Sequence, residues 1–157
     1  MDELTLRPAT VADADLLLRW RNDPTTRGQS LDTAMLSPEP HREWLADRLG
    51  RIDDVRIFIA ELDDVPVAQV RVEREDARRG VVSVSVDRKA RGRGVGTRAI
   101  EAATARASRE LELAEVVAVI RVGNEASRVA FERAGYCRDG ETVVDGANVM
   151  FFRWGRG

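Results

Sequence analysis

The alternation of hydrophobic and polar positions predicts several strands in the first half of the chain. Residues 4–8 alternate as in a short strand. Residues 55–62, 65–75 and 81–86 are apolar or alternating, and acidic or glycine-containing turns separate them. Because these turns are short, the three strands are expected to form an antiparallel meander.

Apolar residues at helical spacing predict two helices in the N-terminal third. The first begins at Thr10, a suitable N-cap, and ends at residues 22–24, because the residue before a proline avoids the α region. Residues 25–36 are mostly polar and are expected to be irregular. Ser37 and Pro38 supply the N-cap and the first-turn proline of the second helix. The apolar positions near one side of the first helix are Val11, Ala14, Leu17, Leu18 and Trp20.

Helix and strand patterns alternate in the second half of the chain. Residues 95–111 and 124–134 predict helices, and Gly135 stands where a helix commonly ends. Residues 116–122 are apolar except for one arginine and predict a strand buried on both faces. Residues 142–144 and 149–154 predict a final hairpin. Val95, Ala99, Ala102, Ala103 and Ala107 are expected to face inward from the first of these helices. The order of elements predicts an α+β domain with a mixed, mostly antiparallel sheet flanked by helices.

Length, charge and cysteine content narrow the class of protein. The 157 residues suit one domain, residues 1–157. A formal net charge of −2 disfavours nucleic acid and anionic membranes as partners. Cys137 is the only cysteine, so a reducing compartment is expected. Acidic residues within 1–20 speak against a secretory signal, and apolar runs are too short to span a bilayer. A cytoplasmic protein without a metal site is expected.

A loop rich in glycine and arginine precedes the helix that starts near residue 95. Gly92, Gly94 and Gly96 allow the backbone to come close to a ligand. The N–H groups and the dipole of the following helix point toward the loop, and Arg91 and Arg93 add positive charge. Such a loop suits a pyrophosphate, and a basic turn without a ligand is the alternative. Neither the Rossmann spacing nor the Gly-Lys-Ser/Thr of a Walker loop is present.

The segment from Val84 to Thr97 resembles the coenzyme A signature of the GNAT acetyltransferase family. The core of that signature is Arg/Gln-x-x-Gly-x-Gly/Ala, and Arg91, Gly94 and Gly96 fill its defined positions. The resemblance implies the GNAT acyl-CoA N-acyltransferase fold, with loop amides on the pyrophosphate of acetyl-CoA and the preceding strand along the pantetheine arm. The coenzyme-binding residues that it implies here are Val84, Ser85, Val86, Arg91, Gly92, Arg93, Gly94, Val95, Gly96 and Thr97.

The segment from Asn124 to Tyr136 resembles a second element of the family, Asn-x-x-Ala/Ser-x-x-x-Tyr-x-x-x-Gly-Phe. The resemblance implies that Asn124 contacts the pantetheine chain, and it adds Ser127 and Phe131 to the coenzyme-binding set. Many members carry a tyrosine at the position of Phe131, where it can protonate the leaving thiolate. For Tyr136, packing against the sheet is favoured over catalysis. Because Phe131 has no proton to donate, backbone amides or water are expected to stabilise the thiolate instead.

Three residues are candidates for the general base that deprotonates the acceptor amine. His41 is the only histidine, titrates in a suitable range, and lies in a region that borders the acceptor site in this fold. Glu73 and Ser83, on central strands, are alternatives that could hold a water molecule. A structural histidine and solvated Glu and Ser side chains are the competing interpretations.

The local patterns of residues 20–24 and 37–45 resemble those of acetyltransferases that modify the amino group of nucleotide-linked amino sugars. More loosely, they resemble those of enzymes that acetylate the N-termini of ribosomal proteins. The resemblance predicts an N-acetyltransferase that uses acetyl-CoA and a small-molecule amine, with a nucleotide sugar preferred as acceptor. Protein N-terminus acetylation and a non-enzymatic acyl-CoA sensor are the alternatives, and a homodimer is left open. The predicted acceptor-binding residues are Trp20, Arg21, Asn22, Arg27 and His41. Buried Trp and solvated Arg side chains are the competing interpretation.

Overall fold

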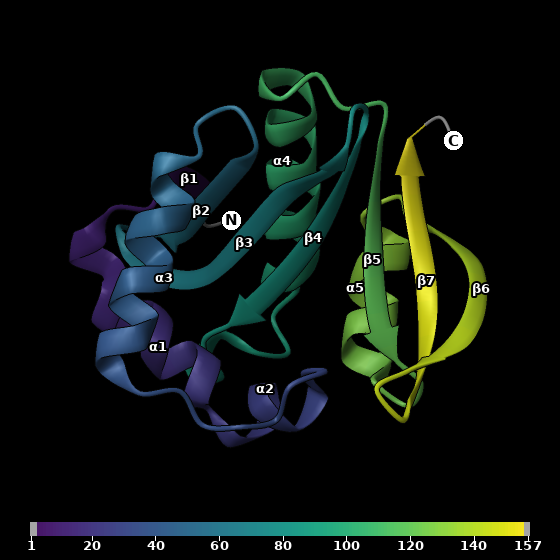
Figure 1. Cartoon of the computed structure of the whole chain (residues 1–157), viewed down its shortest axis with the longest axis horizontal. Coiled ribbons are helices and arrows are strands. Elements are labelled where there is room, and N and C mark those ends of the chain that lie inside the picture. Colours follow the sequence, from purple (N-terminus) through teal and green to yellow (C-terminus); the bar gives the residue numbers. More distant parts are fainter. Residues whose placement is uncertain (1–2, 156–157) are drawn as a thin grey trace.

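The strands of the computed structural model, which describes residues 3–155, form one mixed sheet (Figure 1). They are β1 (Leu4–Pro8), β2 (Val55–Leu62), β3 (Val65–Asp76), β4 (Arg79–Val86), β5 (Glu115–Arg121), β6 (Cys137–Val144) and β7 (Ala147–Gly155). Their spatial order is β1-β2-β3-β4-β5-β7-β6, and β4 and β5 are the parallel neighbours. The other neighbours are antiparallel, so the predicted α+β fold class is confirmed.

Helices cover both faces of this sheet (Figure 1). They are α1 (Ala14–Asn22), α2 (Pro24–Gln29), α3 (Pro38–Gly50), α4 (Val95–Glu110) and α5 (Glu125–Arg133), with short 3₁₀ turns η1 (Val11–Asp13) and η2 (Arg88–Ala90). Helices α1 and α3 pack on one face, whereas α4 and α5 lie behind the sheet in Figure 1.

Strand β2 belongs to two cores because its alternate side chains point to opposite faces. Ile57 and Ile59 pack with α1 and α3, and Leu45 of α3 is fully buried there. Phe58 and Ala60 pack on the other side, in the larger core that includes α4. A strand with helices on both faces explains the nearly continuous apolar run of residues 55–62.

Two predicted element boundaries were wrong. Residues 25–36 were expected to be irregular, but α2 begins at Pro24 because the Asp23 side chain accepts hydrogen bonds from the N–H groups of Thr25 and Thr26. The final hairpin was expected to start at residue 142, but β6 starts at Cys137. The register of β6 shifts between Arg138 and Glu141 and most of its side chains are exposed, which hides the strand pattern.

Three burial predictions also need correction. Val11 is 64% exposed because it lies in the 3₁₀ turn that precedes α1. Strand β5 buries Val116, Ala118 and Ile120 on the α4 side, whereas Val117 on its other face is partly exposed. Ala102, expected to face inward, is partly exposed.

Within residues 3–155, no helix is both long and apolar enough to cross a membrane. The predicted domain, residues 1–157, stays a prediction, and its ends at residues 1–2 and 156–157 lie outside the described part of the chain.

Candidate coenzyme and acceptor site

The parallel strands β4 and β5 separate along the middle of the sheet. Their pairing joins only Arg79–Val81 to Glu115–Val117. Beyond that point β4 continues to Val86, and it is paired with β3 on its other side. Figure 1 shows the two strands diverging toward the end of the sheet where α2 lies. The predicted pantetheine-binding residues, Val84, Ser85 and Val86, lie on the part of β4 that has left β5.

The glycine and arginine loop connects this free end of β4 to α4. Gly92 and Gly94 have positive φ angles of 78° and 74°, which glycine adopts without strain. Gly94 is the N-cap of α4, and a Cβ built on it would meet nothing within 4 Å. The first-turn N–H groups of Val95, Gly96 and Thr97 lack partners inside the helix. The structure therefore places a helix N-terminus, a feature suited to anions, beside the opening between β4 and β5.

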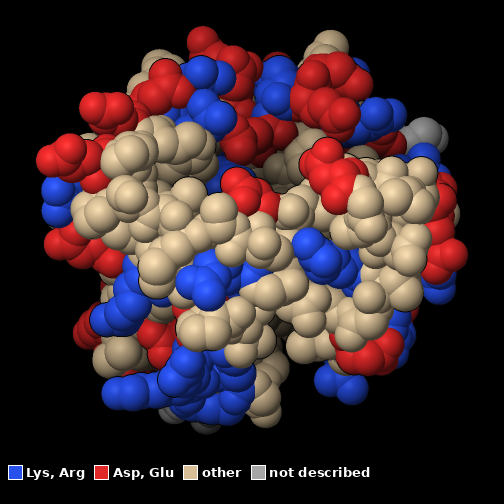
Figure 2. All heavy atoms as spheres, turned by 60° about the horizontal axis from the view of Figure 1, so that its bottom comes forward, with Lys and Arg blue, Asp and Glu red and all other residues tan. Residues whose placement is uncertain are grey.

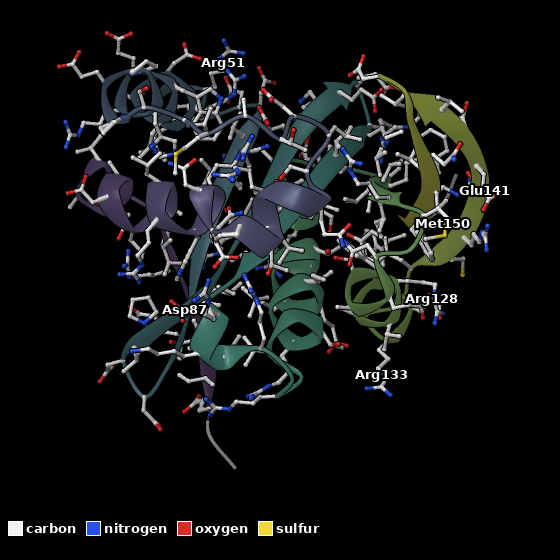
Figure 3. All side chains as sticks on the ribbon, turned by 90° about the horizontal axis from the view of Figure 1, so that it is seen from below. Arg51, Asp87, Arg128, Arg133, Glu141 and Met150 are labelled. Atoms are coloured by element: carbon white, nitrogen blue, oxygen red, sulfur yellow. The ribbon has the colours of Figure 1, made fainter. Side chains whose placement is uncertain are left out.

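Side chains of this loop reach the helices on the other face of the sheet. Arg91 donates from Nη2 to Asp23 Oδ2 at 2.9 Å and to Thr26 Oγ1 at 3.1 Å. Asp87, the N-cap of η2, accepts a 2.8 Å hydrogen bond from Nε1 of Trp20. Figure 3, a view from below, shows Asp87 at the start of η2. The coenzyme loop is thus attached to α1 and α2.

Helix α2 is also attached to β5, on the far side of the opening. Arg121, the last residue of β5, donates from Nε to the carbonyl oxygen of Ser30 at 3.0 Å. Ser30 is the C-cap of α2. Through this bond and the contacts of Arg91, the α2 segment bridges the glycine and arginine loop and the end of β5.

The predicted pantetheine residue Asn124 caps α5. Its Oδ1 accepts from the N–H of Ser127 at 3.2 Å, and its Nδ2 donates to Ser127 Oγ at 3.1 Å. The first-turn Gly96 of α4 lies close to this helix, because a Cβ on it would contact Ala130 at 3.8 Å and Val86 at 3.5 Å. Helix α5 therefore borders the coenzyme loop, and the coenzyme contact of Asn124 stays a prediction.

Phe131 and Tyr136 form an aromatic pair in the core. Their ring centroids are 5.0 Å apart in an edge-to-face arrangement, and the two residues are 2% and 3% exposed. The Tyr136 hydroxyl lies 2.6 Å from Thr104 Oγ1, and burial raises the pKa of Tyr136 well above its usual value. The packing interpretation of Tyr136 is confirmed. Phe131, predicted to line the coenzyme site, belongs to the same core cluster.

Two predicted acceptor residues have structural contacts instead. Trp20 is 3% exposed in the core formed by α1, α3 and β2, so its ring offers no open face to an acceptor, contrary to its prediction as an acceptor-binding residue. Asn22 donates to the carbonyl oxygen of Leu36 at 2.9 Å and accepts from the Leu36 N–H at 2.8 Å. The side-chain amide of Asn22 therefore holds the segment between α2 and α3 against the end of α1. Arg27 lies on α2, partly buried.

Arg21 on α1 and His41 on α3 interact electrostatically. Arg21 donates from Nη2 to the carbonyl oxygen of Asp32 at 2.7 Å. His41 is 5% exposed and stacks on Trp44, with ring centroids 5.7 Å apart. Burial, and then the positive charges of Arg21 and Arg71, lower the pKa of His41. His41 is therefore expected to be neutral at neutral pH.

The other two base candidates lie on the same sheet face as Arg71. Glu73 forms ion pairs of 2.9 Å with Arg71 and with Arg48. Ser83 is the cross-strand partner of Arg71. The structure thus brings His41, Glu73 and Ser83 around one arginine, although they come from α3, β3 and β4.

The candidate site therefore has two parts. One is the diverging strand pair β4 and β5 with the glycine loop and the N-terminus of α4, and the other is the group of side chains around the buried His41. A family model described as "Acetyltransferase (GNAT) domain" matches residues 3–136. This chain belongs to the GNAT acetyltransferase family. The predicted family, the predicted GNAT fold and the predicted class of acetyl-CoA-dependent acetyltransferase are confirmed.

Solved structures show the same fold as this GNAT domain. AAC(6')-Ib, an aminoglycoside acetyltransferase solved with paromomycin and acetyl-CoA, matches with a TM-score of 0.84 and 18% identity, over 99% of this chain and 94% of its own. A ribosomal-protein-alanine N-acetyltransferase from Brucella melitensis matches with a TM-score of 0.82 and 23% identity, over 97% of this chain and 99% of its own. No curated protein sequence matches the chain.

Two further residues of the candidate site, Arg71 and Asp23, were not among the residues predicted from the sequence. Arg71 follows Gln69 and precedes Glu73 on one face of β3, so three alternate polar residues in an otherwise apolar strand were the available signal. Asp23 was interpreted as part of a helix end. The Asp-Pro pair that begins α2 was its signal, because aspartate is a good N-cap and proline a good first residue.

Proposed function

We propose that this GNAT domain transfers the acetyl group of acetyl-CoA to the primary amine of a nucleotide-linked amino sugar. The observation that carries the coenzyme half is the divergence of β4 and β5 beside the N-terminus of α4. Unpaired strand edges offer N–H and C=O groups to an amide-containing chain, and helix N–H groups suit a pyrophosphate. Both features fit acetyl-CoA.

The acceptor half rests on the positive charge near α1 and α3. Arg21 and Arg71 both act on His41 electrostatically, and each can bind the oxygens of a phosphate. Figure 2 turns the α2 end of the molecule forward and shows Lys and Arg side chains on this face, with Asp and Glu side chains above them. A diphosphate between sugar and nucleoside would complement this charge. The arginines at positions 21 and 27 remain the proposed diphosphate ligands.

Transfer requires the amine nitrogen to attack the thioester carbonyl carbon, which forms the C–N bond and expels the coenzyme thiolate. The nitrogen must lose a proton, and we propose that His41 accepts it, directly or through a water molecule. The lowered pKa keeps His41 in the neutral form that accepts a proton. Glu73, paired with two arginines, and Ser83 are the alternative holders of a bridging water. A proton from solvent neutralises the thiolate.

A protein N-terminus is the second candidate acceptor, because one structural relative is a ribosomal-protein-alanine N-acetyltransferase. A non-enzymatic acyl-CoA sensor is the third candidate, since Phe131 occupies the position of the family tyrosine. Turnover of acetyl-CoA with amino sugar nucleotides, free amino sugars, peptides and polyamines separates the three. Selective use of the nucleotide sugar supports the proposal, use of peptides alone replaces it, and coenzyme binding without transfer to any amine supports the sensor.

A further inference from the structure

Trp44 is the centre of a cationic cluster on the acceptor side, formed by Arg21, His41, Trp44, Arg48 and Arg71. His41 stacks on the Trp44 ring, the Arg71 guanidinium lies 4.9 Å from the ring centroid, and that of Arg48 lies 5.5 Å from it. An indole ring attracts guanidinium groups and holds them in fixed positions. The cluster therefore brings together side chains of α1, α3 and β3.

Acidic partners neutralise only part of this cluster. Glu73 pairs with both Arg48 and Arg71 at 2.9 Å, and Arg48 also pairs with Asp47 at 2.8 Å. Arg21, in contrast, makes no ion pair within the described residues, and its bond to Asp32 goes to a neutral backbone carbonyl. Positive charge without a matching carboxylate is costly away from water.

Three polar atoms of the cluster are buried and have no hydrogen-bond partner among the described residues. They are Nη1 of Arg21, Nδ1 of His41 and Nε of Arg48, and of these Nε of Arg48 faces Glu73 Oε1 in an ion pair of 2.9 Å. His41 as a whole is 5% exposed. Buried polar atoms are rarely left without a partner, because an unsatisfied donor costs about 1–3 kcal/mol. An unsatisfied guanidinium donor beside a second arginine is the arrangement that an oxyanion completes.

We propose that Arg21 and Arg71 together bind an anionic group of the acceptor, a phosphate or a carboxylate, and so select anionic amines over neutral ones. The inference rests on the proposed acetyl transfer and adds Arg71 as a specificity-determining residue. Arg71 has a counter-ion, Glu73, and a ring, Trp44, that fix its direction, whereas Arg21 supplies the unpaired donor. The anion thereby gains two guanidinium groups from different elements, which positions the amine relative to the strand opening.

Pairs of acceptors that differ by one anionic group test this selection. A nucleotide-linked amino sugar is compared with the same free sugar, and an amino acid with its amide. The wild-type kcat/KM should favour the anionic member of a pair at least about tenfold, and Arg71→Gln should remove that preference. Arg21→Gln should have the same effect and serves if Arg71→Gln fails to fold. Arg133→Gln, an equal loss of charge on the exposed side of α5 (Figure 3), should leave the preference unchanged.

A binding measurement separates this inference from the proposed function. The protein is saturated with coenzyme A, which occupies the coenzyme loop, and is then titrated with UDP, inorganic pyrophosphate or acetate in a calorimeter. Binding of at least one probe that weakens tenfold or more in both arginine variants supports the anion site, even if no amine is acetylated. Binding that is absent in the wild type, or equal in wild type and folded variants, overturns it while leaving acetyl transfer standing. The phosphate and acetate arms identify which oxyanion is preferred.

Discussion

Asp23 and Arg91 connect the start of α2 to the glycine and arginine loop before α4 through an ion pair of 2.9 Å between Asp23 Oδ2 and Arg91 Nη2. Arg88 lies near the same carboxylate, at 3.4 Å. Burial raises the pKa of Asp23, but hydrogen bonds from Arg91 and from the Thr26 N–H, with the charges of Arg91 and Arg88, lower it overall. The carboxylate that caps α2 therefore also holds the arginine of the coenzyme motif.

Asp23→Asn tests whether this ion pair competes with the coenzyme for Arg91. Asparagine keeps an oxygen that can cap α2 but removes the negative charge. Arg91 is then free to follow the coenzyme phosphates, so calorimetry should show acetyl-CoA binding tighter by about twofold to fivefold, roughly 0.5–1 kcal/mol. Asp15→Asn, at a side chain 85% exposed, is the matched control. Weaker binding in Asp23→Asn would show that the pair holds Arg91 where the coenzyme needs it.

Gly94→Val should weaken acetyl-CoA binding at least about tenfold, or 1.4 kcal/mol. The cause is conformational, because a Cβ at this position meets no atom within 4 Å whereas φ is 74°. A β-branched residue resists that backbone conformation and shifts the N-terminus of α4. Gly94→Asn is the informative companion, since asparagine tolerates positive φ and should bind more tightly than Gly94→Val. Equal affinities of wild type and both variants by calorimetry would remove the loop from the coenzyme site.

Asn124→Ala should lower the free energy of unfolding by about 1 kcal/mol, because the α5 N–H of Ser127 loses its cap. If Asn124 also contacts pantetheine, the KM for acetyl-CoA rises. Asn124→Ser separates the two effects, since serine restores a cap without the amide. A KM that rises in both variants assigns Asn124 to the coenzyme, and a fall in Tm limited to the alanine variant leaves capping as its whole role.

Tyr136→Phe should destabilise the fold by about 1–2 kcal/mol without changing the pH dependence of kcat. The substitution leaves the buried Thr104 hydroxyl without the partner 2.6 Å away. Phe131→Tyr, the reverse change at the family position, puts a hydroxyl into the same core and should keep the fold and measurable activity. Denaturant unfolding and a pH–rate profile check both variants. A profile that changes in Tyr136→Phe would give this tyrosine a catalytic role.

His41→Gln should lower kcat by roughly 10²-fold and flatten the acidic limb of the pH–rate profile. Only neutral His41 accepts a proton, so the wild-type rate rises as pH passes upward through its pKa. Burial and the charges of Arg21 and Arg71 place that pKa below the usual value of about 6.5, and the limb should lie below this pH. Acetyl-CoA affinity should not change. If the profile of the variant matches that of the wild type, His41 is structural and a water held near Glu73 or Ser83 is the better candidate.

The same lowered pKa affects stability. Folded His41 binds a proton less readily than unfolded His41, so the folded state loses stability as pH falls below about 6.5, and the loss is complete below the folded pKa. His41→Gln should remove this part of the pH dependence of unfolding. Equilibrium unfolding of both proteins across this pH range provides the check.

Local patterns predicted most of the strands and the coenzyme loop. Alternation in residues 65–75 and the glycines before residue 95 are signals that need no knowledge of distant contacts. Helix α2 was missed because none of its residues is buried, and hydrophobic spacing therefore could not mark it. The first part of β6, before residue 142, was missed for a similar reason, since the side chains of this strand are mainly exposed.

The acceptor side was harder to predict because its contacts are long-range. Trp20 was predicted to bind the acceptor, but its indole N–H donates a hydrogen bond to Asp87, which comes much later in the chain. Arg71 gained its importance only when folding placed it beside Trp44 and His41. The sequence shows that these residues are polar or aromatic, whereas their neighbours depend on how α1, α3 and β3 pack.

The brief pairing of β4 with β5 leaves a strand edge in the interior of the sheet rather than at its border. Exposed strand edges promote association between chains, and proteins usually shield them with charge, proline or closure. In this domain the α2 segment, fastened to Arg91 and to Arg121, spans only the end of the gap. At the position proposed for it above, the coenzyme would also cover this edge and prevent it from pairing with a strand of a second molecule.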